Sequence, residues 1–350
     1  MKSEMCSMLL ELIKDKYRIV SIVGMAKNSG KTVALNHLIS EAMEESFPIG
    51  LTSIGRDGEA LDIVTETEKP AIFVEEGTLI ATSTKMLDLS DANIEILKVT
   101  QYRTPLGEII IGRVKDGGYV QIAGPQLLSE TKEVAEAMLS LGARAVIIDG
   151  ALDRLSQAAP TISEATILST GAVLSRNMNK VIEETLHTVN TLSLPMVEDE
   201  KVREITREII ENNEIAVIDE ENNAVKIPIK TALNAGTIIG EYINENSKYL
   251  VIPGSLAKNT LEDLIQSTRK YKNIEIIIRD GTKVFVESKD WLRFMRLGIK
   301  VKVLDKINLI AITVNPYSPS GYYFQPDEFL AKMRAYITHI PVVDVMLGCE

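Results

Sequence analysis

Residues 18–46 pass from a β-branched run through a short polar loop into a helical repeat. The run RIVSIVG at 18–24 has the composition of a buried strand, and the apolar residues of 31–46 recur at helical spacing. The loop between them begins at Gly24 and ends at Gly30. A strand that leads into a helix in this way is typical of a parallel sheet with helices on its faces.

The same alternation of strand-like and helix-like segments continues along most of the 350 residues. We therefore predict an α/β fold, a mainly parallel sheet flanked by helices, with a second and smaller α/β domain. At roughly 150 residues per domain, the length also predicts two domains. The alternation restarts after a predicted hairpin around 220–223, so we expect domains at 1–227 and 228–350.

One pair of predicted strands in the first domain has a clear turn signal. Asp116-Gly117-Gly118 separates the runs 107–114 and 119–124, which predicts a hairpin at the edge of the sheet. A further strand is predicted at 309–314, inside the second domain. The remaining strands predicted for the first domain are 50–54, 93–99, 145–149 and 166–170.

The composition argues against several classes of function. The net charge is −11, which disfavours a nucleic-acid partner because such proteins usually present a basic face. The chain has 2 cysteines, at opposite ends, and 3 isolated histidines, without the spacing of a zinc site. No apolar run reaches the ~18 residues that span a bilayer, and the charged N-terminus does not fit a secretory signal. We expect a cytoplasmic protein that binds neither nucleic acid nor membrane.

The segment from Gly24 to Thr32, GMAKNSGKT, predicts a phosphate-binding loop (P-loop). Successive backbone N–H groups and a helix N-terminus attract anions. We expect Lys31 to reach the terminal phosphates of a nucleotide and the Thr32 hydroxyl to bind Mg²⁺. The predicted nucleotide-binding residues are Gly24, Lys27, Asn28, Ser29, Gly30, Lys31, Thr32 and Val33. The alternative, a chance Gly-Lys-Thr at a helix start, is disfavoured by the strand and the glycines.

A carboxylate on a neighbouring strand would complete such a site. Asp149 ends the apolar run AVIID at 145–149, where the carboxyl ends of strands bind ligands in open α/β sheets. We predict Asp149 as a catalytic residue and a ligand of Mg²⁺; the alternative is an Asp-Gly turn. The base-reading and switch motifs of GTPases, Asn-Lys-x-Asp and Asp-x-x-Gly, are absent, so ATP is the expected nucleotide.

The spacing Gly-x5-Gly-Lys-Thr resembles the branch of P-loop proteins that contains dethiobiotin synthetase, cobyrinate amide synthetases and MinD-like ATPases. In that branch the loop after the second strand carries an acidic residue that binds metal and positions the attacking group. The resemblance implies this catalytic and metal-binding role for Asp57, in the segment GRDGE at 55–59, with Glu59 as the alternative residue. The segment could instead be a polar turn without a catalytic role. Members of the branch often dimerise across the nucleotide, so a homodimer is one expectation.

Several segments taken in order are similar to the P-loop subunit of the reactivases that service lysine 5,6-aminomutase. They are VGMAKNSGKT, TSIGRDGE, IIDGALDR, ILSTGAVLSRNM and ITVNPYSPSGYYF. The resemblance implies an ATPase that remodels a cobalamin-dependent aminomutase so that damaged cofactor is exchanged, together with a second ATPase-like subunit. A competing hypothesis is an ATP-dependent ligase of the dethiobiotin or cobyrinate synthetase type, acting on a small carboxylic acid.

The last of these segments also gathers aromatic side chains in a chain that is only 5% aromatic. Such a cluster is typical of a partner-binding surface, although packing within the domain is the favoured explanation. Closer to the predicted nucleotide site, Thr170, Gly171 and Arg176 either face the site or a partner, or serve packing and helix capping. The aromatic residues are Tyr317, Tyr322, Tyr323 and Phe324.

Overall fold

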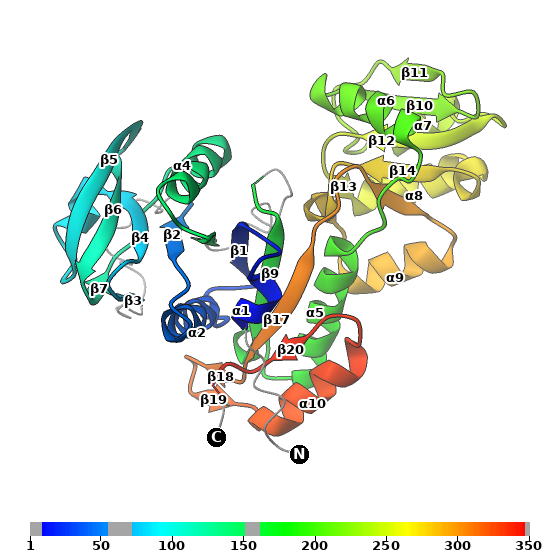
Figure 1. Ribbon diagram of the computed structural model, residues 1–350. Helices are drawn as coiled ribbons and strands as arrows, with labels where there is room; N and C mark the ends of the chain where they lie inside the picture. The colour runs from blue at the N-terminus through cyan, green and yellow to red at the C-terminus, as the bar shows by residue number, and fades with distance from the viewer. Residues whose placement is uncertain (1–8, 55–71, 151–161, 347–350) are drawn as a thin grey trace. The chain divides into compact units, whose positions relative to one another are not determined.

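The computed structural model describes residues 9–54, 72–150 and 162–346. The chain divides into two compact units: Met1–Thr185 together with Asn308–Glu350, and Leu186–Ile307. Helix α5 (Met178–Leu192) runs across the first point of division. Each unit is a sheet with helices on its faces (Figure 1), which confirms the predicted α/β class.

The first unit is built on a nine-stranded mixed sheet with the order β20-β17-β9-β1-β8-β2-β4-β6-β5 (Figure 1). Neighbouring strands from β20 through to β4 run parallel, whereas β6 is antiparallel to both β4 and β5. The strands are β1 (Ile19–Gly24), β2 (Ile49–Ser53), β4 (Leu79–Ser83), β5 (Asn93–Thr104), β6 (Gly107–Asp116), β8 (Ala145–Asp149), β9 (Ala165–Gly171), β17 (Leu309–Asn315) and β20 (Val342–Val343).

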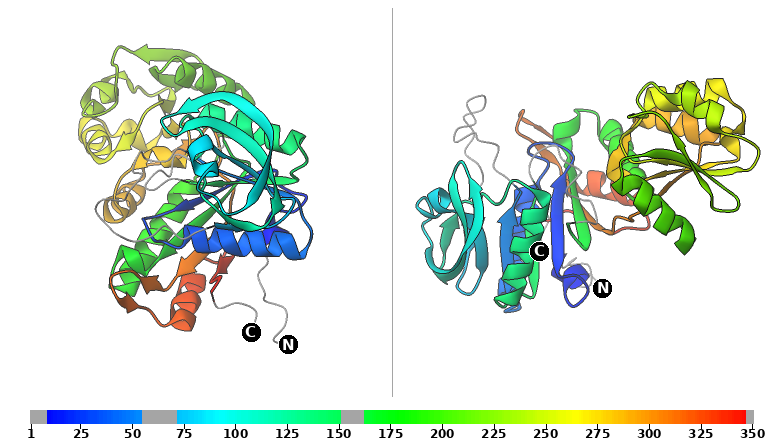
Figure 2. Two further views of the ribbon diagram at one scale, coloured as in Figure 1. Left: turned by 90° about the vertical axis from the view of Figure 1, so that its left-hand side faces the viewer. Right: turned by 90° about the horizontal axis from the view of Figure 1, so that it is seen from above.

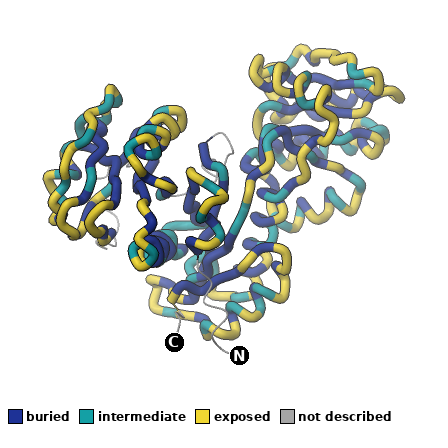
Figure 3. The backbone as a smooth tube through the Cα atoms, viewed as in Figure 1, coloured by how far each residue is buried: buried dark blue, intermediate teal, exposed yellow. Residues whose placement is uncertain are grey.

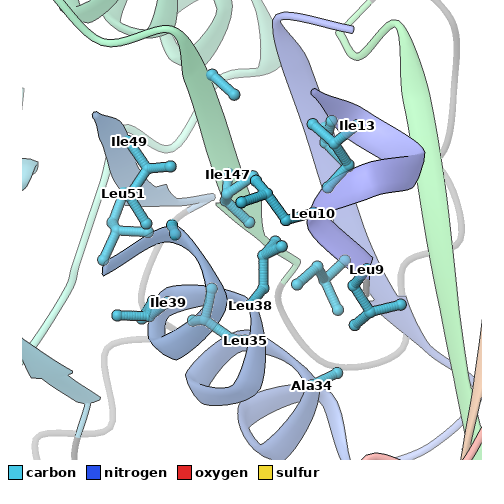
Figure 4. Packing of buried hydrophobic residues seen from close by; sticks show 14 of the residues in the cluster. Leu9, Leu10, Ile13, Ala34, Leu35, Leu38, Ile39, Ile49, Leu51 and Ile147 are labelled. Carbon is cyan, nitrogen blue, oxygen red and sulfur yellow. The ribbon is translucent and has the colours of Figure 1, made fainter. Parts of the chain in front are cut away.

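The central strands are apolar on both sides, so helices cover both faces of this sheet. Helices α1 (Leu9–Ile13) and α2 (Lys31–Glu44) pack on the face that includes Ile147 (Figure 4). Helix α4 (Leu128–Ser140) packs on the opposite face, which includes Ile148. Because successive side chains of a strand point to opposite faces, β8 contributes to both hydrophobic clusters.

The predicted hairpin at Asp116–Gly118 is wrong. The hairpin lies one connection earlier, where β5 and β6 pair with Thr104 opposite Gly107, and it is drawn in cyan in both views of Figure 2. The next strand, β7 (Gly118–Val120), leaves β6 and pairs with β3 (Ile72–Val74). Glycine is required here by close packing rather than by a turn: a Cβ on Gly118 would lie 2.6 Å from the backbone nitrogen of Ala92.

Strand β5 forms one edge of the nine-stranded sheet, and all of its residues are exposed or half-buried, in yellow and teal at the left of Figure 3. The pairing of β5 with β6 changes register between Ile96 and Lys98, and again between Val99 and Arg103. Irregularities of this kind are typical of exposed edge strands, where they discourage pairing with another chain.

The second unit contains a five-stranded sheet with the order β11-β10-β12-β14-β16. Strands β12, β14 and β16 are parallel, and β10 is antiparallel to both of its neighbours. Helix α6 packs on one face and helices α7, α8 and α9 pack on the other. The strands are β10 (Ile215–Asp219), β11 (Ala224–Ile227), β12 (Ser247–Ile252), β14 (Glu275–Ile278) and β16 (Val301–Val303); the helices are α6 (Glu200–Glu211), α7 (Gly236–Tyr242), α8 (Lys258–Ser267) and α9 (Ser288–Arg296).

The hairpin predicted around 220–223 is confirmed as β10–β11. The Asp219 carboxylate accepts the backbone N–H groups of Glu221 and Asn223, at 2.9 and 2.8 Å, and Asn222 adopts a φ of 68°. These bonds make a compact turn, because an Asp side chain can satisfy backbone donors within its own turn. The pKa of Asp219 is lowered by the hydrogen bonds from Asn223 to its carboxylate.

The division of the chain differs from the boundary expected between 227 and 228. Strand β17 pairs with β9, and β20 pairs with β17, so the described tail from residue 308 to residue 346 returns to the first unit and adds two strands to its sheet. The β10–β11 hairpin instead belongs to the second unit, because β10 pairs with β12. Alternation along the sequence reveals that a strand exists, but the sheet that the strand joins is decided by contacts between distant segments.

Candidate functional site

The residues from Gly24 to Gly30, here called the glycine loop, connect the carboxyl end of β1 to α2. Asn28 and Gly30 both adopt left-handed conformations, with φ of 62° and 99°. The loop is fixed to the neighbouring strand, since the Met25 N–H donates to the carbonyl oxygen of Ser169 at 3.0 Å. The glycine loop therefore curls over the sheet edge in a conformation that suits glycine and asparagine best.

Gly24 allows the loop to fold back on itself. A Cβ at this position would lie 2.4 Å from Oγ of Ser29 and 2.9 Å from Cγ of Lys31. Ser29 is 1% exposed, and its Oγ has no hydrogen-bond partner among the residues that the structure describes. A buried hydroxyl without a partner is rare in folded proteins and calls for an explanation such as a bound ligand.

The N-terminus of α2 follows the glycine loop directly and can attract an anion. Its first turn contains no acidic residue, and no side chain caps it, because the N-cap residue is Gly30. The first backbone N–H groups of a helix have no partner within the helix, and together with the helix dipole they favour an anion. Lys31, Thr32 and Val33 are half-buried at this end of α2. This end of α2 is therefore suited to an anion.

The structure places Asp149 on the strand next to the glycine loop. Strands β8 and β1 are parallel with Asp149 opposite Ile22, and the Gly150 N–H donates to the carbonyl oxygen of Ile22 at 2.9 Å. Asp149 is half-buried, and one of its carboxylate oxygens is shielded from solvent. Asp149 and the glycine loop therefore lie at the same edge of the sheet, as the sequence predicts.

The second carboxylate expected from the sequence, Asp57, lies outside the described residues, as does its alternative Glu59. Over 9–54, 72–150 and 162–346, no group of three or more His, Cys, Asp or Glu side chains is placed to hold a metal ion. Thr32 and Asp149 remain the predicted protein ligands of Mg²⁺. A hydroxyl and a carboxylate suit this cation, which prefers oxygen ligands and usually keeps several waters.

Asn315 is a residue at this edge that sequence reasoning missed. It is the last residue of β17, and its side-chain Nδ2 donates to the carbonyl oxygen of Asn28 at 3.3 Å. Its backbone oxygen would lie 2.3 Å from a Cβ on Gly171, the last residue of β9. A polar residue directly after a predicted strand is a weak signal, and β17 was expected in another domain.

The aromatic segment after Asn315 forms a small hairpin of β18 (Tyr317–Ser318) and β19 (Tyr322–Tyr323). The Tyr322 hydroxyl donates to the carbonyl oxygen of Ala172 at 2.6 Å, and the Arg176 guanidinium lies 5.2 Å from the Tyr322 ring centre. The rings of Tyr317 and Tyr323 are exposed and lie 5.9 Å apart. The cluster thus divides into residues that anchor the hairpin and an exposed aromatic pair.

Comparisons of the chain with protein families, with curated proteins and with solved structures returned no match. None of the helices in the described part of the chain is both long enough and apolar enough to cross a bilayer. A functional hypothesis therefore rests on the chemistry at the carboxyl edge of the first sheet.

Proposed function

We propose that the chain is a P-loop NTPase that binds ATP with Mg²⁺ in the glycine loop and hydrolyses it. The observation that carries this proposal is the folded-back loop at the end of β1, where a Cβ on Gly24 would collide with Ser29 and Lys31. The buried Ser29 Oγ, which has no hydrogen-bond partner in the described part of the chain, and the uncapped N-terminus of α2 add to it. Together these groups form the kind of backbone cradle that holds nucleotide phosphates.

The proposed roles follow from the chemistry of each side chain. The Lys31 ammonium neutralises charge on the terminal phosphates, and the Thr32 hydroxyl and the Asp149 carboxylate hold Mg²⁺. Bound Mg²⁺ supplies further positive charge to the transferring phosphoryl group. Asp57 is proposed to position the attacking water. Catalysis would depend mainly on placing positive charge where negative charge develops.

The use made of ATP is proposed from the resemblance to aminomutase reactivases. In this proposal nucleotide binding and hydrolysis drive the remodelling of a cobalamin-dependent aminomutase, in concert with a second ATPase-like subunit. Asn315 contacts the glycine loop. The exposed residues Tyr317 and Tyr323 follow Asn315 in the sequence by two and eight residues. An exposed aromatic pair close to the proposed nucleotide site is compatible with a surface that engages a partner.

Removal of the Lys31 amine tests the catalytic proposal. We expect wild-type protein to bind ATP with Mg²⁺ in isothermal titration calorimetry and to release phosphate. Lys31→Ala should lower turnover by about 10²-fold or more, since an electrostatic contact to the transition state is lost. Lys132→Ala, on the exposed side of α4, is the matched control and should retain wild-type turnover. Undiminished turnover in Lys31→Ala, or no nucleotide binding by wild-type protein, would refute the proposal.

The identity of the partner requires a separate experiment. Proteins that co-purify with the chain in the presence of ATP should be compared with those that co-purify in ADP. The reactivase proposal expects an aminomutase and a second ATPase whose retention differs between the two nucleotides. ATPase activity that is stimulated by a small carboxylic acid, and unaffected by any protein partner, would instead favour the ligase hypothesis.

A further inference from the structure

Both the nitrogen and the oxygen of the Asn315 side-chain amide form hydrogen bonds. Nδ2 donates to the carbonyl oxygen of Asn28 in the glycine loop at 3.3 Å, and Oδ1 accepts the backbone N–H of Tyr317 at 3.1 Å. One side chain therefore joins the glycine loop to the start of the β18–β19 hairpin. These two segments are separated by 287 residues in the sequence.

The bond to Asn28 acts on a single peptide plane. The carbonyl of Asn28 belongs to the peptide whose N–H is that of Ser29, and this N–H donates to the carbonyl oxygen of Ala26 at 3.3 Å. Because the peptide group is planar, holding its oxygen and its N–H together fixes the orientation of the whole unit. The following residues, Gly30 and Lys31, lead directly into the anion-binding end of α2.

Packing restricts the position of Asn315 as well. Its Cβ would lie 3.0 Å from a Cβ on Gly30, and its backbone oxygen 2.3 Å from a Cβ on Gly171. Two glycines therefore give Asn315 the space to approach the loop from the end of β17. A longer or branched residue at either glycine would push the two segments apart.

We propose that Asn315 is a positioning residue that holds the Asn28–Ser29 peptide, and so the path of the glycine loop into the N-terminus of α2, and that it links the glycine loop to the β18–β19 hairpin. The two hydrogen bonds of Asn315 position the loop without nucleotide. The link to the hairpin rests on the proposed function, because it has a purpose only if the loop binds phosphate. Occupancy of the loop would then be transmitted to the exposed pair Tyr317 and Tyr323.

Hydrogen exchange in nucleotide-free protein tests the positioning role independently of ATP. Asn315→Ala removes both bonds, and we expect the amides of Ser29 and Tyr317, which donate hydrogen bonds in the structure, to exchange about fivefold faster, the effect of one ordinary hydrogen bond. The serine in Asn315→Ser can still cap the Tyr317 N–H but is too short to reach Asn28. This variant should accelerate exchange in the loop alone.

Asn308→Ala is the matched control, since Asn308 precedes the other end of β17 and its Nδ2 also donates to a backbone carbonyl, that of Glu164 at 2.9 Å. It should leave exchange of the glycine loop and of Tyr317 unchanged. Equal acceleration at Ser29 and at Tyr317 in Asn315→Ser, or no acceleration at Ser29 in Asn315→Ala, would overturn the positioning role.

Kinetics and nucleotide binding test the link to function. Asn315→Ala should raise KM for ATP about fivefold with kcat within about twofold of wild type, because a displaced cradle weakens ground state and transition state alike. Loss of folded protein would instead lower kcat at constant KM, and that result would contradict the proposal.

ADP should slow hydrogen exchange at Tyr317 in wild type and not in Asn315→Ala. If wild-type protein binds no nucleotide in calorimetry, the proposed function and the link fail together, while the exchange data still decide the positioning role.

Discussion

The carboxylate of Glu41 accepts the backbone N–H of Leu10 at 2.7 Å. Its other oxygen accepts the N–H of Leu9 at 3.1 Å, so one buried side chain on α2 satisfies two donors at the start of α1. Leu10 packs beside Leu38 of α2 and Ile147 of β8 (Figure 4). The helix that begins at the glycine loop therefore holds α1 on the sheet through both apolar contacts and hydrogen bonds.

Glu41→Gln should destabilise the protein, because the amide keeps one acceptor and turns an NH₂ group toward a backbone donor. We expect a loss of about 1–3 kcal/mol in the free energy of unfolding, the cost of leaving a buried donor without a partner. Urea unfolding followed by circular dichroism measures this loss. Glu44→Gln, on the same helix but exposed, is the matched control and should change stability little. Equal losses in the two variants would contradict this account of Glu41.

His37 should make the stability of the first unit depend on pH. Its Nε2 lies 3.1 Å from Oε1 of Glu41, and this hydrogen bond raises the pKa of His37 above its usual 6.5, with a smaller contribution from the charge of Glu44 and partial opposition from burial. Protonated His37 therefore stabilises the fold fully below the unfolded-state pKa, and this contribution is lost as pH rises through the raised folded-state pKa.

The stability difference between wild type and His37→Gln is the measurement that isolates this effect. It should be larger at about pH 6 than at about pH 8.5, because only the protonated imidazole gains from the neighbouring carboxylates. Titration of His37 by NMR should also show a lower pKa in Glu41→Gln than in wild type. A pKa at or below the ordinary value in wild-type protein would rule out the interaction.

The parts of the fold that were predictable are those that local sequence determines. Strand β8 has the predicted limits, 145–149, and β9 extends the predicted 166–170 by one residue at each end. A buried strand in a parallel sheet reads as a continuous apolar run, and glycines bound the loop that follows β1. The placement of Asp149 beside the glycine loop was predictable because strand ends of a parallel sheet meet at one edge.

The parts that were not predictable depend on contacts between distant segments. Nothing local to 309–315 indicates that β17 pairs with β9, so neither the return of the tail to the first sheet nor the contact of Asn315 with Asn28 was expected. The sequence predicts a turn at Gly118 because its contact with Ala92, in another segment, is not visible in the sequence. Its lack of a side chain serves close packing against Ala92, which only the folded structure reveals.

Gly24→Ala should impair nucleotide binding more than it impairs folding. The added Cβ would lie 2.4 Å from Ser29 Oγ and 2.9 Å from Lys31 Cγ. The hydroxyl can rotate away, but Cγ of Lys31 lies in the middle of its side chain, so the ammonium must move with it. We expect ADP affinity in calorimetry to fall by about tenfold or more, equivalent to about 1.4 kcal/mol.

Gly254→Ala provides the comparison that separates this clash from a general effect of losing a glycine. A Cβ on Gly254 meets no atom within 4 Å, and the residue follows β12 in the second unit. This variant should bind ADP with wild-type affinity. In Gly24→Ala, the thermal midpoint without nucleotide should stay near that of wild type, because the displaced atoms belong to one serine and one lysine side chain. Wild-type ADP affinity in Gly24→Ala would show that the glycine loop does not form the phosphate cradle.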